Sequence, residues 1–201
     1  MKHVLVTFAM CILVTTSSQA QIVFGIKGGI NVATIGGADA ASMLKSRTGF
    51  AAGAYLEASF PFLVTVQPEM LYTTKGFTFS SASFGQTVTS TNTYSYIEIP
   101  VLVKFYLPVP VVKPSLYVGP EMGFLLSAEN KYEATGFSTR ETNIDSLLSS
   151  TDFGVVFGAS VHVLITDIEA RYTLGLRTTD KSGQARLYNR VWSIMVGIPL
   201  Y

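Results

Sequence analysis

The chain has 201 residues, enough for one sizeable domain, and its 14 lysines and arginines nearly balance its 13 aspartates and glutamates. This balance excludes the electrostatic attraction to nucleic acid that a basic excess would provide. Hydrophobic residues make up 48% of the chain and charged residues only 13%, about half of the usual charged share. A composition this apolar indicates either a membrane protein or an unusually large core.

The N-terminus predicts a cleaved secretory signal peptide. Met1–His3 is a short basic segment, Val4–Val14 is apolar, and Ser18–Ala20 is a small-residue cleavage site. The apolar run is too short to cross a membrane as a helix. We therefore expect residues 1–20 to be removed and residues 21–201 to form one exported domain. Cleavage would also remove the only cysteine, and with it any disulfide or cysteine metal site.

The rest of the chain contains segments in which apolar and polar residues alternate. Alternation of this kind is typical of a β-strand with one apolar face, because successive side chains of a strand point to opposite sides. Eight segments follow the pattern, and in chain order they are Gln21–Val32, Gly49–Ser59, Leu63–Thr78, Tyr96–Tyr106, Pro114–Ser127, Thr151–Leu164, Ile168–Arg177 and Asn189–Tyr201.

The connections between these segments alternate in length. The long, polar connections are Ala33–Thr48, Phe79–Asn92, Ala128–Ser150 and Thr178–Tyr188. The short turns are Phe60–Phe62, Pro108–Lys113 and Ile165–Asp167. Long loops at one end and short turns at the other are typical of outer-membrane barrels. The pattern predicts an all-β fold: an eight-stranded antiparallel up-and-down transmembrane β-barrel with long outer loops and short periplasmic turns.

The polar face of these segments carries a set of charged residues that we expect to form a structural, charge-paired network in the barrel interior. Its members are Lys27, Glu57, Glu69, Lys75, Glu98, Lys104, Glu121, Glu169 and Arg171. Charges buried in this way must be paired, because removing them from water is costly. The near balance of their signs predicts a plugged interior rather than an open pore.

A soluble barrel would put the same charges in water and the apolar residues in its core. Two features favour the membrane arrangement. Glycines cluster on the polar face, as a crowded eight-stranded interior requires. Large apolar residues fill the other face, and aromatic residues fall near the ends of the segments, as in interfacial girdles.

The mature chain resembles the PorT family of outer-membrane β-barrels over nearly its whole length. The stretches that carry the resemblance occur in order and are GIKGGINV, QPEMLYTTKG, YIEIPVLVKFY, YVGPEMGFLLSA, DFGVVFGAS, EARYTLGL and NRVWSIMVGI. The resemblance implies a location in the cell outer membrane, insertion by the barrel-assembly machinery and, for some relatives, a link to protein secretion.

One departure from the family pattern lies at the C-terminus, where Pro199 precedes Tyr201. Because proline is confined to edges and bulges, we predict a β-bulge or a slip in the alternation at Pro199.

Chemical motifs are few. Ser160 and His162 share a strand face with Asp167 nearby, but the pattern favours hydrogen bonds inside the barrel over nucleophilic catalysis. Asp145 and Asp152 lie in or beside a long loop, where carboxylates are usually solvated rather than bound to a cation. We therefore predict no catalytic, cofactor-binding or metal-binding residues and no enzymatic activity.

Three functions remain open on the sequence. The first is a structural or protein-interaction barrel, whose outer loops or periplasmic turns bind partners such as secretion components. The second is a small-solute channel, and the third is a soluble, lipocalin-like ligand-binding barrel in the periplasm. For the first, the expected partners are membrane lipid, lipopolysaccharide, the outer-membrane insertion machinery, and secretion or surface proteins, with no nucleic acid.

Overall fold

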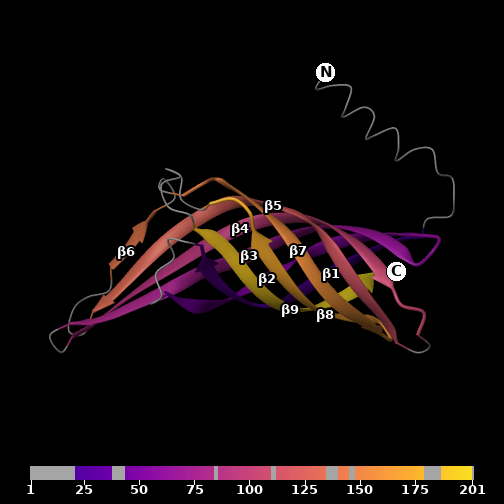
Figure 1. The fold of residues 1–201 in the computed structure, drawn as a ribbon, viewed down its shortest axis with the longest axis horizontal. Coiled ribbons are helices and arrows are strands. Elements are labelled where there is room, and N and C mark those ends of the chain that lie inside the picture. Colours follow the sequence, from indigo (N-terminus) through magenta and orange to yellow (C-terminus); the bar gives the residue numbers. More distant parts are fainter. Residues whose placement is uncertain are drawn as a thin grey trace, which may run out of the picture.

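The computed structural model describes residues 21–37, 44–83, 86–109, 112–134, 140–144, 148–178 and 187–200. The predicted signal peptide lies outside these residues. The described residues form nine strands (Figure 1), which are β1 (Gln21–Gly36), β2 (Leu44–Phe60), β3 (Val64–Ser83), β4 (Gln86–Tyr106), β5 (Lys113–Ala134), β6 (Arg140–Asn143), β7 (Thr151–Val163), β8 (Thr166–Gly175) and β9 (Tyr188–Leu200). None of the described residues forms a helix long and apolar enough to cross a membrane.

The strands form one antiparallel sheet that closes on itself. The sheet order is β4-β3-β2-β1-β9-β8-β7-β5-β6, and an additional pairing between β4 and β5 joins its two sides. This pairing closes a ring of eight strands and leaves β6 attached to β5 outside the ring. The predicted eight-stranded antiparallel barrel is confirmed, and β6 is a short addition that the sequence did not indicate.

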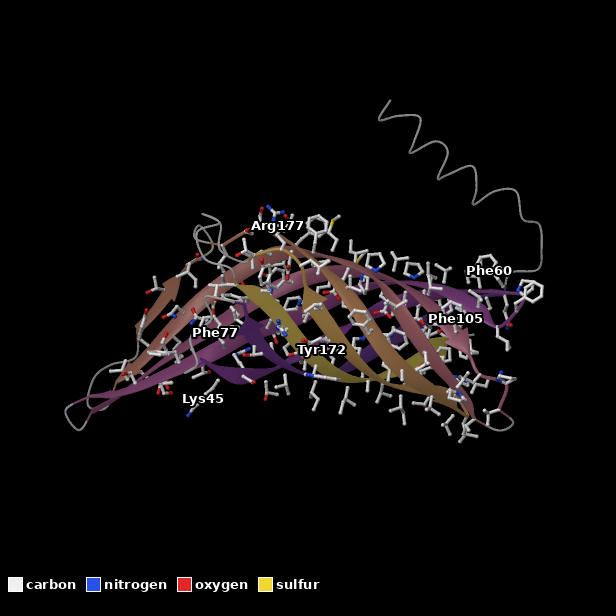
Figure 2. All side chains as sticks on the ribbon, viewed as in Figure 1. Lys45, Phe60, Phe77, Phe105, Tyr172 and Arg177 are labelled. Atoms are coloured by element: carbon white, nitrogen blue, oxygen red, sulfur yellow. The ribbon has the colours of Figure 1, made fainter. Side chains whose placement is uncertain are left out.

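The outer face of the barrel wall is apolar and the inner face is polar, which is the arrangement that a membrane requires. In β9 the exposed side chains include Trp192 and Ile194, whereas Asn189 and Met195 are buried. Trp192 is 62% exposed, while the side chain of Lys104 in β4 is 1% exposed. A soluble barrel would bury the first and expose the second. The apolar face is therefore the outer, lipid-facing one (Figure 2), and the soluble, lipocalin-like alternative is wrong.

The strands extend further at the outer end than the sequence predicted. The predicted loop Phe79–Asn92 is instead a hairpin in which β3 and β4 remain paired as far as Ser83 and Gln86. Similarly, the predicted loop Ala128–Ser150 contains the end of β5, as far as Ala134, and all of β6. The hairpin is rich in serine and threonine, and threonine favours strands through its β-branched side chain. Because polar residues occur on both faces of these extensions, they lack the regular alternation of the other segments.

The last strand runs straight through its proline. Burial alternates in β9 up to Leu200, and Pro199 pairs with Gly25 of β1 in an unbroken register. The predicted bulge or slip at Pro199 is therefore wrong. Pairing between β8 and β9 ends at Gly197, so proline's missing N–H interrupts no ladder on that side. Register shifts occur instead between Ser46 and Ala51 and between Ser95 and Tyr96, and Tyr201 lies outside the described residues.

The short turns at the periplasmic end contain bulky residues in a left-handed backbone conformation. Phe62 and Leu63 between β2 and β3 have φ of 69° and 63°, and Leu164 between β7 and β8 has φ of 58°. Large side chains rarely adopt this conformation, which costs about 1–3 kcal/mol per residue. These turns therefore hold conformational strain that glycine or asparagine would relieve.

Candidate functional site

The inward-facing side chains of the barrel form three groups along its length. The central group consists of Lys27 on β1, Glu69 on β3, and Glu169 and Arg171 on β8. Lys27 Nζ donates to Glu69 Oε1 at 2.7 Å and to both carboxylate oxygens of Glu169 at 3.1 Å. Arg171 Nη1 and Nη2 donate to the two oxygens of Glu69 at 2.9 and 3.1 Å. Arg171 also pairs with Glu169, so two cations and two carboxylates balance one another.

The periplasmic group lies towards the short turns and centres on Lys104 of β4. Lys104 Nζ donates to Glu57 Oε1 at 3.0 Å and to Gln67 Oε1 at 2.7 Å. The amide of Gln67 in turn donates to Glu69 Oε1 at 2.5 Å. This hydrogen bond connects the periplasmic group to the central group. The polar interior is therefore continuous between these two groups.

The outer group surrounds Lys75 of β3 and is not balanced in charge. Lys75 Nζ pairs with Glu98 and lies 3.6 Å from Glu121 Oε1 and 4.0 Å from Asp152 Oδ2. Asp152 also accepts a hydrogen bond of 2.7 Å from the Asn189 amide. Three carboxylates thus share one lysine in a part of the barrel that water scarcely reaches.

The structure places all the charged residues predicted for the interior in these three groups. Eight of the nine are buried, and the side chain of Glu57 is 13% exposed. Asp152 is a residue for which the sequence interpretation was wrong: it is buried against Lys75 instead of solvated in a loop. The signal that could have identified it is strand alternation: Asp152 is two and six residues from Gly154 and Gly158, so it shares their inward-facing side of the strand. Asp145 lies outside the described residues.

Tyrosine rings lie beside the cations of the charged groups and were not singled out from the sequence. The ammonium of Lys27 lies 4.9 Å from the ring centre of Tyr55, and that of Lys75 lies 5.4 Å from the ring centre of Tyr96. Arg171 lies 5.9 Å from the ring centre of Tyr117. Such contacts between cations and aromatic faces are attractive, and more so where water is excluded. The rings thus fill the lumen and also stabilise the charges beside them.

Two glycines make room for these rings. A Cβ atom at Gly25 would overlap the ring of Tyr55, and one at Gly158 would overlap the ring of Tyr117. Each tyrosine therefore lies directly over the backbone of the neighbouring strand, at the glycine with which it is paired. This close approach explains why glycine occupies these two positions on the polar face, where a narrow barrel has least space.

An apolar cluster closes the lumen at its outer end. Its buried members are Ile35, Tyr94, Tyr96 and Ala128, and the partly buried residues packed against them are Phe77, Leu125, Ile144, Leu148 and Leu187. The ring of Phe77 meets that of Tyr94 edge-on, with ring centres 6.2 Å apart. Among the described residues, these apolar side chains pack together in the lumen at the outer end of the barrel.

The candidate catalytic residues do not form a nucleophile–base pair. The hydroxyls of Ser160 and Ser115 are hydrogen-bonded at 2.7 Å, and His162 Nδ1 lies 3.1 Å from Asp167 Oδ1. Activation of a serine requires its hydroxyl to hydrogen-bond the base. Here Ser160 is engaged by another serine instead. Among the described residues, no group of three or more histidines, cysteines, aspartates and glutamates is arranged to hold a metal ion.

Comparison with known proteins agrees with this geometry. A family model described as an outer membrane protein beta-barrel domain matches residues 17–181. The structure of Neisserial surface protein A superimposes with a TM-score of 0.53 at 16% identity, covering 87% of this chain and 96% of that one. The outer membrane protein OprG from Pseudomonas aeruginosa has a TM-score of 0.50 at 11% identity, covering 90% and 97% of the two chains. These identities are so low that the likeness shows the fold alone. No curated protein matches the chain.

Proposed function

The chain belongs to the outer membrane protein β-barrel domain family, and on that premise we propose that it is a closed barrel that binds another protein through a sheet raised above the membrane. Its location is the cell outer membrane, in contact with lipid and lipopolysaccharide. The observation that carries the proposal is the continuation of β3, β4 and β5 beyond the apolar cluster, with β6 added at the edge (Figure 1).

The filled interior supports a role in binding rather than in transport. The central charged group is fully paired, tyrosine rings lie across the lumen, and apolar residues close the outer end. A solute would have to displace ion pairs whose separation inside a protein costs several kcal/mol. These features argue against the small-solute channel. The expected result in planar bilayers is the absence of stable conductance, and reproducible conductance steps would revive the channel alternative.

The outer sheet, as we name this extension, consists of Phe77–Ser83, Gln86–Asn92, Ala128–Ala134 and β6. Its strands are paired throughout, from Ser83 with Gln86 to Tyr132 with Arg140. In the described part of the chain, β6 ends the sheet order and has β5 as its strand neighbour. An edge strand can pair with an extended segment of another protein, which adds a strand to the sheet.

Two exposed apolar side chains lie on the same face of the outer sheet and offer an anchor for such a partner. Tyr132 pairs with Ser90 and Val88 pairs with Ala134, so Tyr132 and Val88 are diagonal neighbours across β4 and β5. Both are among the exposed hydrophobic residues, although the outer sheet lies beyond the lipid-facing part of the barrel. Exposed tyrosines surrounded by polar residues are frequent anchors in protein interfaces.

The resemblance to the PorT family suggests the nature of the partner. We propose that the chain is a PorT-like barrel inserted by the barrel-assembly machinery, and that its partner is a protein of secretion or of the cell surface. We propose no catalytic activity, a choice supported by the bond between Ser160 and Ser115, which leaves His162 paired with Asp167.

Site-specific photo-crosslinking in intact cells tests the proposal. A photoreactive residue at the exposed Thr142 of β6 is expected to capture a specific protein, whereas the same residue at the lipid-facing Ile194 is not. The substitution Tyr132→Ala should lower the yield at Thr142 several-fold, with Leu116→Ala on the lipid face as the matched control. Identical products from both crosslinking positions, or no protein product at Thr142, would overturn the proposal.

A further inference from the structure

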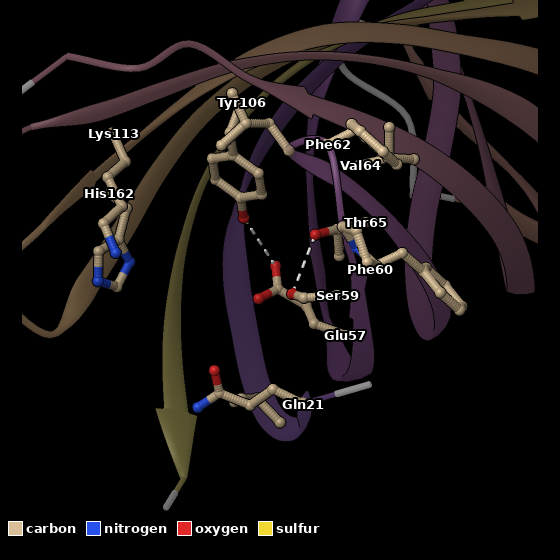
Figure 3. Close-up of a pocket in the computed structure, with 13 residues that line it drawn as sticks. Gln21, Glu57, Ser59, Phe60, Phe62, Val64, Thr65, Tyr106, Lys113 and His162 are labelled. Atoms are coloured by element: carbon tan, nitrogen blue, oxygen red, sulfur yellow. Dashed lines mark hydrogen bonds between the residues drawn. The ribbon is translucent and has the colours of Figure 1, made fainter. Parts of the chain in front are cut away.

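The periplasmic end of the barrel contains a pocket that the interaction proposal does not use. Its volume is about 540 Å³, and Figure 3 shows the residues that line it. One wall is apolar and comes from the turn between β2 and β3, with Phe60, Phe62 and Leu63. The other side is polar and carries Glu57 on β2, Lys113 on β5 and His162 on β7. An opening with one apolar and one charged wall suits an amphipathic ligand.

The apolar wall lies at the depth where the lipid headgroups begin. Phe50 and Phe60 are both exposed to lipid and are ten residues apart on β2. At ~3.3 Å per residue and a strand tilt of ~40°, they span ~25 Å along the barrel axis, which is the usual height of the apolar band. Phe60 therefore marks the periplasmic edge of the band. The turn that follows lies among the phospholipid headgroups of the periplasmic leaflet.

The backbone of the turn between β2 and β3 is strained where it exposes its bulky side chains. Phe62 and Leu63 are consecutive residues with positive φ, and Phe62 is 95% exposed. The neighbouring turn between β7 and β8 repeats the arrangement, because Leu164 also has positive φ and is 88% exposed. Strained, exposed, bulky residues are more often kept for contact with a ligand than for stability. At this depth the available apolar material is the acyl and glycerol region of a lipid.

The charged wall carries groups of both signs. Glu57 uses Oε1 to accept hydrogen bonds from Lys104 and Tyr106, at 3.0 and 3.5 Å, and no described residue bonds its other oxygen. Across the mouth, Lys113 and His162 lie together because β5 and β7 pair at these residues (Figure 3). Lys113 makes no ion pair with a described residue.

From this arrangement we propose that the pocket binds the zwitterionic headgroup of a phospholipid of the periplasmic leaflet. Lys113 and Nε2 of His162 face the phosphate, because Nδ1 of His162 lies 3.1 Å from Asp167 Oδ1. The second oxygen of Glu57 faces the ammonium group. Phe62 and Leu63 contact the glycerol and the upper acyl carbons. Charge-assisted hydrogen bonds at both ends of the headgroup would distinguish phosphatidylethanolamine from phosphatidylglycerol, which has no ammonium group.

Calorimetry with the full mature barrel in a maltoside detergent tests the proposal, because this detergent carries no phosphate. The probes are dihexanoyl phosphatidylethanolamine, dihexanoyl phosphatidylglycerol and inorganic phosphate. We expect saturable binding of the first, weaker binding of the second and none of the third. Lys113→Gln should weaken the first about tenfold, as expected for the loss of one charge-assisted hydrogen bond. Lys45→Gln, at an exposed lysine of the outer end, is the matched control.

Each contrary result has a defined meaning. Equal binding of the two lipids, or displacement of either by inorganic phosphate, would reduce the pocket to a general anion site and overturn the proposal. Unchanged affinity in Lys113→Gln would do the same. Heat-modifiable gel migration confirms that each variant is folded. A photoreactive residue at Phe62 in outer-membrane vesicles should capture lipid, and capture of a protein without lipid would assign the pocket to a protein partner. Both tests are independent of the outer sheet.

Discussion

Among the described residues, Glu69 accepts four side-chain hydrogen bonds, and its replacement tests the interior network directly. It accepts hydrogen bonds from Lys27, from both terminal nitrogens of Arg171 and from Gln67. The substitution Glu69→Gln preserves its size and removes its charge. Lys27 and Arg171 would then share the single carboxylate of Glu169. Leaving a buried charge without its partner costs about 3–5 kcal/mol.

The magnitude can be measured by equilibrium unfolding in lipid vesicles. Trp192 is the only tryptophan and faces the lipid, so its fluorescence reports the loss of the inserted barrel. We expect Glu69→Gln to lower the free energy of unfolding by about 3–5 kcal/mol. The double variant Glu69→Gln/Lys27→Met should recover part of this loss, because one cation then faces one carboxylate.

A surface pair provides the control for this measurement. Lys131 and Glu133 form an ion pair of 2.9 Å on the outer sheet, with side chains that are 45% and 51% exposed. Exposed pairs contribute about 0–1 kcal/mol, so Glu133→Gln should have a small effect. The reasoning is refuted if Glu69→Gln costs no more than Glu133→Gln, or if the double variant is less stable than the single one.

Three further predictions concern other parts of the barrel. Gly158→Leu should abolish folding, because the added side chain occupies the space of the Tyr117 ring, and heat-modifiable gel migration will detect the loss; normal migration would contradict the contact. Replacing Phe62 and Leu63 with Asn and Gly should raise the unfolding free energy by about 1–3 kcal/mol through relief of strain, measured by the same fluorescence assay, and no gain would refute the strain. Lys75→Met leaves three buried carboxylates without a cation, so the variant should be unstable at neutral pH and regain stability near pH ~4, where carboxyl groups become neutral; pH-independent stability would contradict this account.

The architecture was readable from the sequence because two independent signals agree. Alternation along a segment such as Tyr96–Tyr106 decides which side chains share a face, and the lengths of the connections decide which ends of the strands meet. Once the apolar face is assigned to lipid, Glu98 and Lys104 must point inwards, and the structure buries both. Neither step requires knowledge of any contact between strands.

The pairing of the interior charges could not be read in this way. Lys27 and Glu169 form an ion pair although they are 142 residues apart in the sequence. Whether they come into contact depends on how far each strand is staggered against the next. Alternation fixes the face of a residue but leaves its height in the barrel undetermined. Asp152 lies where a strand begins, in or beside the predicted loop, and was interpreted as a solvated carboxylate.

The outer sheet was missed for a different physical reason. A strand in the membrane alternates because one face meets lipid, whereas a strand in water between other strands is under no such constraint. The segment Phe79–Asn92 therefore had the composition of a loop, although its described residues are strand residues in which β3 pairs with β4 and β4 pairs with β5. Its threonines were the remaining signal, but strand preference depends strongly on context.

The central ion pairs have a consequence for how the barrel enters the membrane. Lys27 lies on the first strand and Glu169 on the strand before the last, so their contact crosses the seam where β1 joins β9. Before that seam forms, Lys27 and Arg171 would project from an incomplete sheet into hydrocarbon, where an unpaired charge is costly. Partial insertion is thus penalised by the same groups that stabilise the finished barrel. We expect insertion and closure to occur as a single cooperative event, with the charges shielded by water or by an assembly factor until the first and last strands meet.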